Sequence, residues 1–474
     1  MVQPPSPWRG FAVISVAVFV ASLDLFIVNI AFPAIQADFP EASVSGLSWV
    51  LSAYAIVYAA LLVPLGKLGD LAGRLRVFRA GLALFTAGSA LCALAPSAEM
   101  LVAARVLQAA GAAAITPTSL CLVLPRFPAE RRSSVIGAWA AFGGIGAAMG
   151  PPLGGLLVEL SWHWIFVINL PLGVGCLALV GRHFDEIRDP SGRLPDALGA
   201  ALAIGAVGLL AMGLTQGPDW SWDARVLGSL AAAVVLGALL VARSRRHLEP
   251  VLALDLLRSP TFSLASLATF LFFAGFAGLL LGNVLFLTGV WGWSPLLAGL
   301  AFAPGPLLAA TFAMLSGRLA DRLGSPAVLG VPGGVLFAIG AAFYLMLPAD
   351  PHYLTHYLPG TILTGTGVGL SLPALTASAL MAVPGPKLAT GLATSTAFRQ
   401  VGAALGVATW VAVHGTPAPG EVLTAFDRSF VLVGCCGLAA GATLLVLAVR
   451  LRATAYAAAR AGRSTAASRG APAS

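Results

Sequence analysis

The sequence predicts an all-α protein that crosses a membrane many times, and two observations support this fold class. Of its 474 residues, 58% are hydrophobic and 10% are charged, whereas soluble domains carry about 25% charged residues. The apolar residues also form continuous runs of about 20, the length that a helix needs to cross the hydrocarbon core of a bilayer. A transmembrane β-barrel is excluded, because its strands alternate apolar and polar residues.

Fourteen apolar runs of about this length follow one another along the chain. They cover residues 10–32, 47–65, 77–95, 98–124, 134–158, 164–181, 197–215, 225–242, 261–287, 296–316, 327–347, 357–382, 390–413 and 429–449. An even number places both termini on one side. If that side is the cytoplasm, 23 of the 27 Lys and Arg residues are cytoplasmic and only Arg225 and Arg428 are external, in agreement with the positive-inside rule. The net charge of +8 therefore reflects topology and predicts no nucleic-acid partner.

The fourteen runs divide into two halves of six, separated by an inserted hairpin. Residues 1–181 are expected to form the first six-helix bundle, 182–260 a linker with two extra transmembrane helices, and 261–450 the second bundle. The stretch 451–474, rich in Ala, Arg, Ser and Gly, is expected to be a disordered cytoplasmic tail. A repeat supports the halves: GKLGDLAGR at 66–74 follows the second run, and GRLADRLG at 317–324 follows the tenth. Repeated halves around a central path are typical of transporters.

Asp24 lies inside the first apolar run. A carboxylate near the middle of a membrane span costs roughly 2.5–3.5 kcal/mol on insertion-based scales, so it usually marks an ion or substrate path. We predict that Asp24 takes up and releases a proton during the working cycle. The alternative is a carboxylate that one neighbouring cation neutralises permanently.

Arg105 is the expected partner of Asp24. It shares one face of the fourth run with Gln108 and Thr116, so this polar stripe should face water or another helix. From the outer surface, Arg105 lies roughly 10 Å deep and Asp24 roughly 12 Å deep, at 1.5 Å per helical residue. A nearby guanidinium favours the charged carboxylate and burial favours the neutral acid, so protonation can depend on conformation. The alternative is a static salt bridge.

Other polar side chains complete a predicted substrate cavity. Tyr54 and Tyr58 lie one turn apart in the second run and could stack on an organic substrate or pack in the core. Asn29 lies about 140° around the helix from Asp24, so we expect its side chain to bond a neighbouring helix. The predicted cavity residues are Gln108, Thr116, Tyr54, Tyr58 and Asn29.

Several motifs resemble those of the major facilitator superfamily. The pattern G-x-L-x-D-x-x-G-R at 66–74 is similar to motif A, 105–111 resembles motif B, and 146–155 resembles motif C, which is associated with exporters. The stretches 23–33, 162–171 and 293–300 resemble signatures of the fourteen-span drug:proton antiporters. The resemblance implies two six-helix bundles plus a two-helix hairpin, in the cytoplasmic (inner) membrane of a bacterium. It also implies a conformational latch on the cytoplasmic side, formed by Gly66, Asp70, Gly73, Arg74 and Asp321, with Arg74 pairing between the halves.

Glycines give motif C a mechanical interpretation. Gly146, Gly150 and Gly154 recur every four residues and allow close helix packing, while Pro151 kinks or stiffens the span. Together with Gly155, they are expected to seal the two halves against each other. Arg399 lies on a small-residue face of the thirteenth run, where it could bind helix-end carbonyls or substrate.

The predicted function is proton-coupled antiport that exports amphipathic, cationic or neutral organic compounds. The alternatives are a dedicated exporter of one endogenous metabolite or natural product, an importer, and a receptor or lipid-modifying enzyme, which would need a catalytic cluster that the sequence lacks. No nucleotide-binding G-x-x-x-x-G-K-[ST] loop is present. We expect no enzyme activity, no cofactor, no metal and a monomer. One buried acid predicts one proton per cycle.

Overall fold

The structure, a computed structural model, describes residues 7–128, 131–188, 194–323, 327–381, 383, 388–418 and 420–469, and this part of the chain contains helices and no strand. The first half comprises α1 (Pro7–Asp38), α2 (Val44–Ala72), α3 (Arg74–Ala93), α4 (Ala98–Val123), α5 (Arg132–Val158), α6 (Trp164–Val167) and α7 (Asn169–His183). The inserted hairpin is α8 (Ala197–Gln216) and α9 (Ala224–Ser244). The second half comprises α10 (Leu254–Leu257), α11 (Pro260–Leu285), α12 (Pro295–Phe302), α13 (Pro304–Leu323), α14 (Ala327–Phe343), α15 (Leu358–Leu380), α16 (Leu388–His414) and α17 (Val422–Arg469).

Thirteen helical segments of the described chain are long and apolar enough to cross a membrane. Two of them are interrupted helices: α6 with α7, and α12 with α13, where Pro304 begins the new helix. The one predicted run without a counterpart among these thirteen segments is 390–413, the thirteenth along the chain; it corresponds to α16, which has 27 residues. Four threonines, Ser395, Arg399 and Gln400 interrupt its apolar character. The prediction of an all-α membrane protein is confirmed.

Short polar side chains mark several helix starts. The hydroxyls of Ser43, Ser97 and Ser294 accept hydrogen bonds from the backbone N–H groups three residues further on, at 3.1, 3.3 and 3.3 Å. Asp196 does the same at the start of α8, at 2.8 Å. These side chains satisfy N–H groups that the first helical turn leaves without a partner. The helices therefore begin where the sequence provides a cap.

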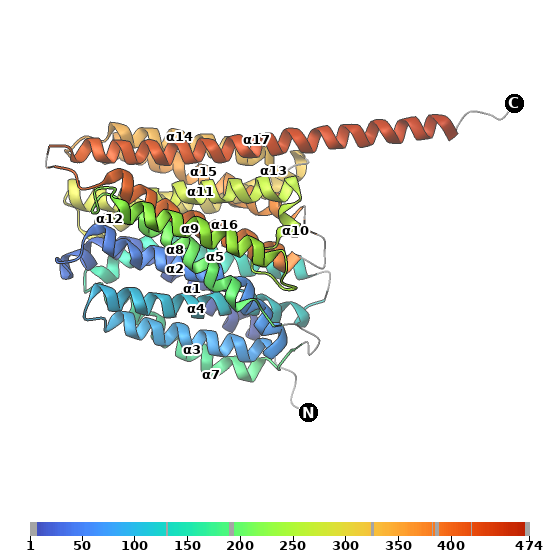
Figure 1. The fold of residues 1–474 in the computed structure, drawn as a ribbon, viewed down its shortest axis with the longest axis horizontal. Coiled ribbons are helices and arrows are strands. Elements are labelled where there is room, and N and C mark those ends of the chain that lie inside the picture. Colours follow the sequence, from blue (N-terminus) through green and yellow to red (C-terminus); the bar gives the residue numbers. More distant parts are fainter. Residues whose placement is uncertain are drawn as a thin grey trace.

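The helices gather into two bundles that lie side by side (Figure 1). In the first, α1 packs on α5, and α4 packs on α2 and α3; in the second, α11 packs on α16 and α17, and α14 on α15 and α17. The main contacts between the bundles are α2 with α16 and α5 with α12. Both chain ends lie at the same end of the helices (Figure 1). The arrangement fits the predicted fold class, while the domain boundaries stay predictions.

The inserted hairpin touches both bundles. Its first helix, α8, packs against α2 of the first half and α16 of the second. The contact is a small apolar cluster of buried residues, Ala55, Ile56, Ala211, Ala404 and Ala408. After α9, Glu249 forms an ion pair with Lys67 at the end of α2, at 3.1 Å. The hairpin is therefore a packed part of the molecule.

The chain end differs from the expectation of a disordered tail. In the structure, α17 continues as one helix through Arg469 and projects beyond the bundle (Figure 1). The reason lies in composition: the residues after 450 are rich in Ala and Arg, which are among the strongest helix formers.

Candidate functional site

The carboxylate of Asp24 lies in a sealed polar site inside the first half, where its side chain is 0% exposed. Its Oδ2 accepts a hydrogen bond from Arg105 Nη1 at 2.5 Å, within a buried ion pair. Its Oδ1 accepts from Gln108 Nε2 at 2.7 Å and from Asn169 Nδ2 at 2.9 Å. The structure thus brings Asp24, Arg105 and Gln108 together and adds Asn169, so that one charged and two neutral groups donate to the carboxylate.

Further contacts fix the guanidinium of Arg105. Its Nε donates to the carbonyl of Val50 at 3.2 Å, and Nη1 also donates to Gln108 Oε1 at 2.6 Å. Its central carbon lies 4.1 Å from the centre of the Tyr54 ring, a distance at which the ring face attracts a cation. Such contacts are needed because a buried ion pair offsets its desolvation only with good geometry and further hydrogen bonds.

Close packing of α3 on α4 brings the supporting side chains into place. A Cβ atom on Gly88 would lie 2.8 Å from the Cα of Gln108, so only glycine permits this approach. The next residue, Ser89, is fully buried, and its hydroxyl oxygen accepts hydrogen bonds from Gln108 Nε2 at 2.7 Å and Asn169 Nδ2 at 3.2 Å. Ser89 therefore orients the two amides that face Asp24.

Sequence reasoning missed Asn169 and Ser89 as site residues. Asn169 begins α7 and is the only amide or charged residue within the run 164–181. The rule that an intramembrane polar group is functional by default could have identified it. Ser89 gave no comparable signal, because serine occurs in many membrane helices. Two buried polar atoms at the site have no hydrogen-bond partner, Arg105 Nη2 and Asn169 Oδ1.

The site combines an acid, a cation and two amides. Asp24 offers one acid, Arg105 one permanent positive charge, and the amides offer donors and acceptors. Among the described residues, no group of three or more His, Cys, Asp and Glu side chains is placed to hold a metal ion. The arrangement therefore places one ionisable carboxylic acid beside one permanent positive charge, both fully buried.

Tyr54, Tyr58 and Thr116 form a chain of contacts that begins at Arg105, which Tyr54 touches. The two tyrosine rings are stacked, with centroids 6.1 Å apart and planes 10° apart. The Tyr58 hydroxyl is hydrogen-bonded to Thr116 Oγ1 at 2.9 Å. Both rings are buried in the hydrophobic core of the first half, so this structure shows them packed.

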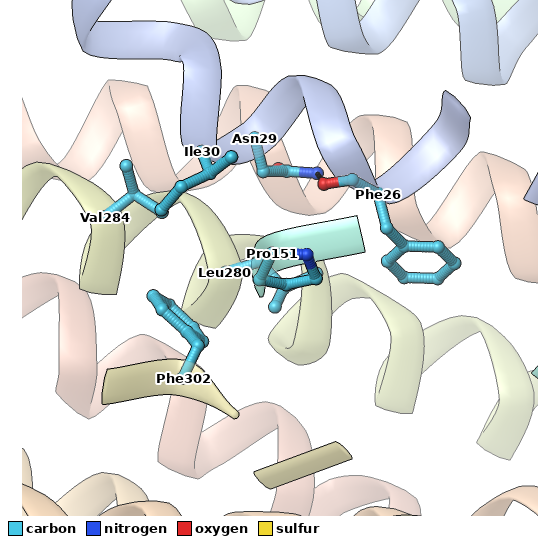
Figure 2. Close-up of a pocket in the computed structure, with 7 residues that line it drawn as sticks. All are labelled: Phe26, Asn29, Ile30, Pro151, Leu280, Val284 and Phe302. Atoms are coloured by element: carbon cyan, nitrogen blue, oxygen red, sulfur yellow. Dashed lines mark hydrogen bonds between the residues drawn. The ribbon is translucent and has the colours of Figure 1, made fainter. Parts of the chain in front are cut away.

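Asn29 lies elsewhere, in a small pocket between the halves (Figure 2). Its Nδ2 donates to backbone carbonyls of its own helix, those of Leu25 at 3.4 Å and Phe26 at 3.3 Å. The expectation that Asn29 bonds a neighbouring helix is therefore wrong, because a carbonyl one turn back is within closer reach. The pocket has a volume of only about 10 Å³, which is about the space of one water molecule. It is lined by Phe26, Asn29, Ile30, Pro151, Leu280, Val284 and Phe302. It does not include the other four predicted cavity residues.

The glycines of α5 divide between two different contacts. A Cβ on Gly146 would lie 2.5 Å from a backbone carbonyl of α1, and Gly150 and Gly154 also face α1. These three pack within the first half, so their assignment to a seal between the halves is wrong. Their four-residue spacing reports only a close helix contact and does not identify its partner.

Pro151 and Gly155 do face the second half. A Cβ on Gly155 would lie 2.7 Å from the carbonyl oxygen of Pro295, and one on Gly299 would lie 2.5 Å from the carbonyl oxygen of Pro151. The ends of α5 and α12 therefore meet backbone to backbone. Near this contact, the backbone N–H of Leu296 donates to Glu159 Oε1 at 3.2 Å.

At the opposite end of the helices, the motif A residues form contacts within the first half. Arg74 donates through Nε to Asp70 Oδ1 at 2.9 Å and through Nη1 to the carbonyl of Cys121 at 3.3 Å. The expected pairing of Arg74 between the halves is therefore wrong in this structure, because Asp70 lies one turn before it. Gly66 allows α2 to approach Pro117 of α4, which a Cβ would meet at 3.2 Å.

Gly73 forms the turn between α2 and α3, and it has a φ of +114°, which favours glycine. The carboxylate of Glu186 occupies the space beside it and accepts hydrogen bonds from the backbone N–H groups of Leu75 at 2.9 Å and Arg76 at 3.0 Å. Sequence reasoning missed this acidic cap at the positive end of α3, because Glu186 is more than 100 residues away. The predicted latch residue Asp321 lies in α13, and its side chain is outside the described part of the chain.

Three comparisons identify similar proteins. A family model described as the Major Facilitator Superfamily matches residues 14–407. Multidrug resistance protein Stp of Mycobacterium tuberculosis is 36% identical over 82% of this chain and 72% of its own length. A probable actinorhodin transporter of Streptomyces coelicolor is 33% identical over 85% of this chain and 71% of its own length. A solved peptide transporter, POT in complex with sulfate, is 18% identical, covers 93% of this chain and 94% of its own, and has a TM-score of 0.68.

Proposed function

We propose a function from the premise that the chain belongs to the Major Facilitator Superfamily. The protein is a proton-coupled antiporter that exports amphipathic organic compounds, drugs among them, by alternating access. The similarity to a protein named for multidrug resistance supports export of drugs. The excess of basic residues at the cytoplasmic ends of the helices supports a bacterial cytoplasmic membrane with both termini in the cytoplasm. The protein works as a monomer.

One observation supports proton coupling above all others: a single acid, fully buried, faces Arg105 within a membrane-spanning bundle. Protonation of Asp24 would neutralise it and leave the positive charge of Arg105 without its counter-ion. The two protonation states then favour different packing around α4, which is what coupling requires. A protonated carboxyl also needs an acceptor for its O–H, and rotation of the Asn169 amide would present the Oδ1 that has no partner.

The remaining sites serve the conformational cycle. The turn between α2 and α3 is held by Asp70, Gly73, Arg74 and Glu186. At the opposite end of the molecule, α5 packs against α12 through Pro151 and Gly155. Substrate enters between the halves, near Tyr58 and the small pocket at Asn29, when these contacts separate.

A second candidate is dedicated export of one natural product, which the similarity to a probable actinorhodin transporter favours. The two candidates differ in breadth of substrate and share the proton-coupled mechanism. Susceptibility to a chemically diverse set of compounds in an efflux-deficient host separates them: protection against many compounds supports the first, and against one class the second.

Transport by the purified chain in sealed vesicles tests the proposed function directly. An imposed pH gradient should drive uphill movement of ethidium or another fluorescent amphiphile, and addition of that compound should release protons that a trapped pH dye records. Collapse of the gradient with a protonophore should stop both signals. Substrate movement that is indifferent to the gradient would disprove proton coupling.

Substitution of Asn169 tests whether its amide is needed to position the Asp24 carboxylate. Asn169→Leu keeps the approximate shape and removes one of three donors to the carboxylate. A hydrogen bond to a charged group contributes about 1.5–3 kcal/mol. We therefore expect the rate of gradient-driven export in vesicles to fall about tenfold.

Gln216→Leu is the matched control, because it also replaces an amide with leucine, at the last residue of α8 in the hairpin. It should export at the wild-type rate. An Asn169→Leu variant that exports as fast as the wild type would show that the Asn169 donor is dispensable.

A further inference from the structure

Arg399 is the second arginine inside a membrane span, and its surroundings differ from those of Arg105. It lies in α16, roughly 16 Å along the helix from Leu388 at 1.5 Å per residue. The side chain is half-buried where α16 packs between α2 of the first half and α11 of the second. Its guanidinium carbon lies 5.5 Å from the centre of the Phe273 ring. Arg399 therefore lies at the contact between the halves.

No acid in the described ranges forms an ion pair with Arg399. Ion pairs in this part of the chain involve other cations, among them Lys67, Arg74, Arg105, Arg126, Arg225 and Arg243. Arg105, which is more deeply buried, has Asp24, a carbonyl and an amide oxygen as acceptors. A cation withdrawn from water without a counter-ion is strongly unfavourable, and an aromatic face compensates for only part of this. The described side chains therefore provide no counter-ion for Arg399, and a bound anion could supply one.

The residues around Arg399 are suited to an organic ligand. Phe273 supplies one aromatic surface, and Tyr58 belongs to α2, the helix of the first half on which α16 packs. Tyr58 belongs to the first half and Arg399 to the second, so a ligand there would touch both. Gly402 and Gly406 press α16 against backbone carbonyls of α11, which fixes the helix that carries Arg399.

We propose that Arg399, with Tyr58 and Phe273, forms a subsite for the anionic group of an amphipathic substrate, such as a carboxylate or a phenolate. The planar guanidinium can donate two parallel hydrogen bonds to such a group, while the aromatic rings contact the apolar body. The proposal rests on the proposed transport function and names its substrate class: acids bind better than neutral or cationic compounds of the same shape.

Charge transfer follows from this substrate class. Export of a monoanion against one entering proton moves two positive charges inward per cycle, whereas export of a monocation moves none. A membrane potential that is negative inside should therefore accelerate export of an acid and leave export of a cation unchanged.

Equilibrium binding to the purified full chain tests the subsite without requiring transport. The probes are three pyrenes of similar size: 1-pyrenebutyrate, 1-pyrenebutanol and a pyrenylbutyl-trimethylammonium salt, measured by fluorescence polarisation. We expect the wild type to bind the acid about tenfold more tightly than the alcohol, as a charge-assisted hydrogen bond supplies. In Arg399→Gln this ratio should fall to near one, and Arg399→Lys should keep part of it.

Arg428→Gln is the matched control, because Arg428 is an exposed arginine in α17 of the same half. It should keep the wild-type ratio, and thermal unfolding should show that each variant is folded. A wild-type chain that binds the acid no better than the alcohol, or an Arg399→Gln variant with an undiminished ratio, would overturn the proposal. Failure of the proposed function would appear separately, as vesicles that transport no compound although the binding preference is present.

Discussion

Asp24→Asn should reduce gradient-driven export to the level of empty vesicles. The amide is nearly isosteric with the carboxyl group and its oxygen can still accept a hydrogen bond from Arg105, but it cannot carry a proton. Arg105 keeps its contacts to Val50, Gln108 and the face of Tyr54, so the variant should still fold. The expected result is a folded protein that no longer couples substrate movement to protons.

The measurement compares wild type and Asp24→Asn in an efflux-deficient host at matched membrane levels, and then in vesicles with an imposed pH gradient. Asp223→Asn is the control, since Asp223 is an exposed acid that caps α9 and pairs with Arg225. Equal resistance from Asp24→Asn and wild type would remove Asp24 from the mechanism.

Arg105→Gln should have the largest effect on stability. It leaves the Asp24 carboxylate buried without a counter-ion, and breaking a buried pair from one side typically costs about 3–5 kcal/mol. The double variant Asp24→Asn/Arg105→Gln removes both charges and should recover most of that loss. Neither variant should transport, since the single variant lacks the charge balance and the double variant also lacks the acid.

Thermal unfolding of the purified variants in detergent measures this cycle. The unfolding temperature should be lowest for Arg105→Gln and closer to wild type for the double variant, because contacting residues are not additive. The decrease in unfolding temperature of the double variant could instead equal the sum of the decreases in Asp24→Asn and Arg105→Gln. In that case the two residues are not coupled, and Arg105 stabilises the protein through its contact with Tyr54.

Features that follow from the composition of each helix and from depth in the membrane could be predicted from the sequence. The membrane runs follow from composition, and the meeting of Asp24 with Arg105 follows from depth along two helices. The number of fully apolar spans differed by one because polar residues in α16 face a protein interior, where hydropathy is a poor guide.

Features that depend on which helices are neighbours could not be predicted. The spacing of Gly146, Gly150 and Gly154 indicates a close contact but not that α1 provides it. Ser89 supports the acid only because Gly88 lets α3 approach α4. Glu186 caps the start of α3 although it lies more than 100 residues later in the sequence. In each case the tertiary neighbour, and not the local pattern, determines the role.

The inserted hairpin restricts how the halves can rock. The helix α8 contacts both α2 of the first half and α16 of the second. When the two halves move relative to each other, α8 can move together with only one of them, so its contact with the other half must change. The Lys67–Glu249 ion pair attaches the hairpin to the first half. The contact that changes is then the one between α8 and α16 at Ala404 and Ala408. The small methyl groups of these alanines interlock little with the facing helix. If α16 can slide along α8 at this smooth surface, the hairpin can stay packed against the same side of the molecule throughout the transport cycle.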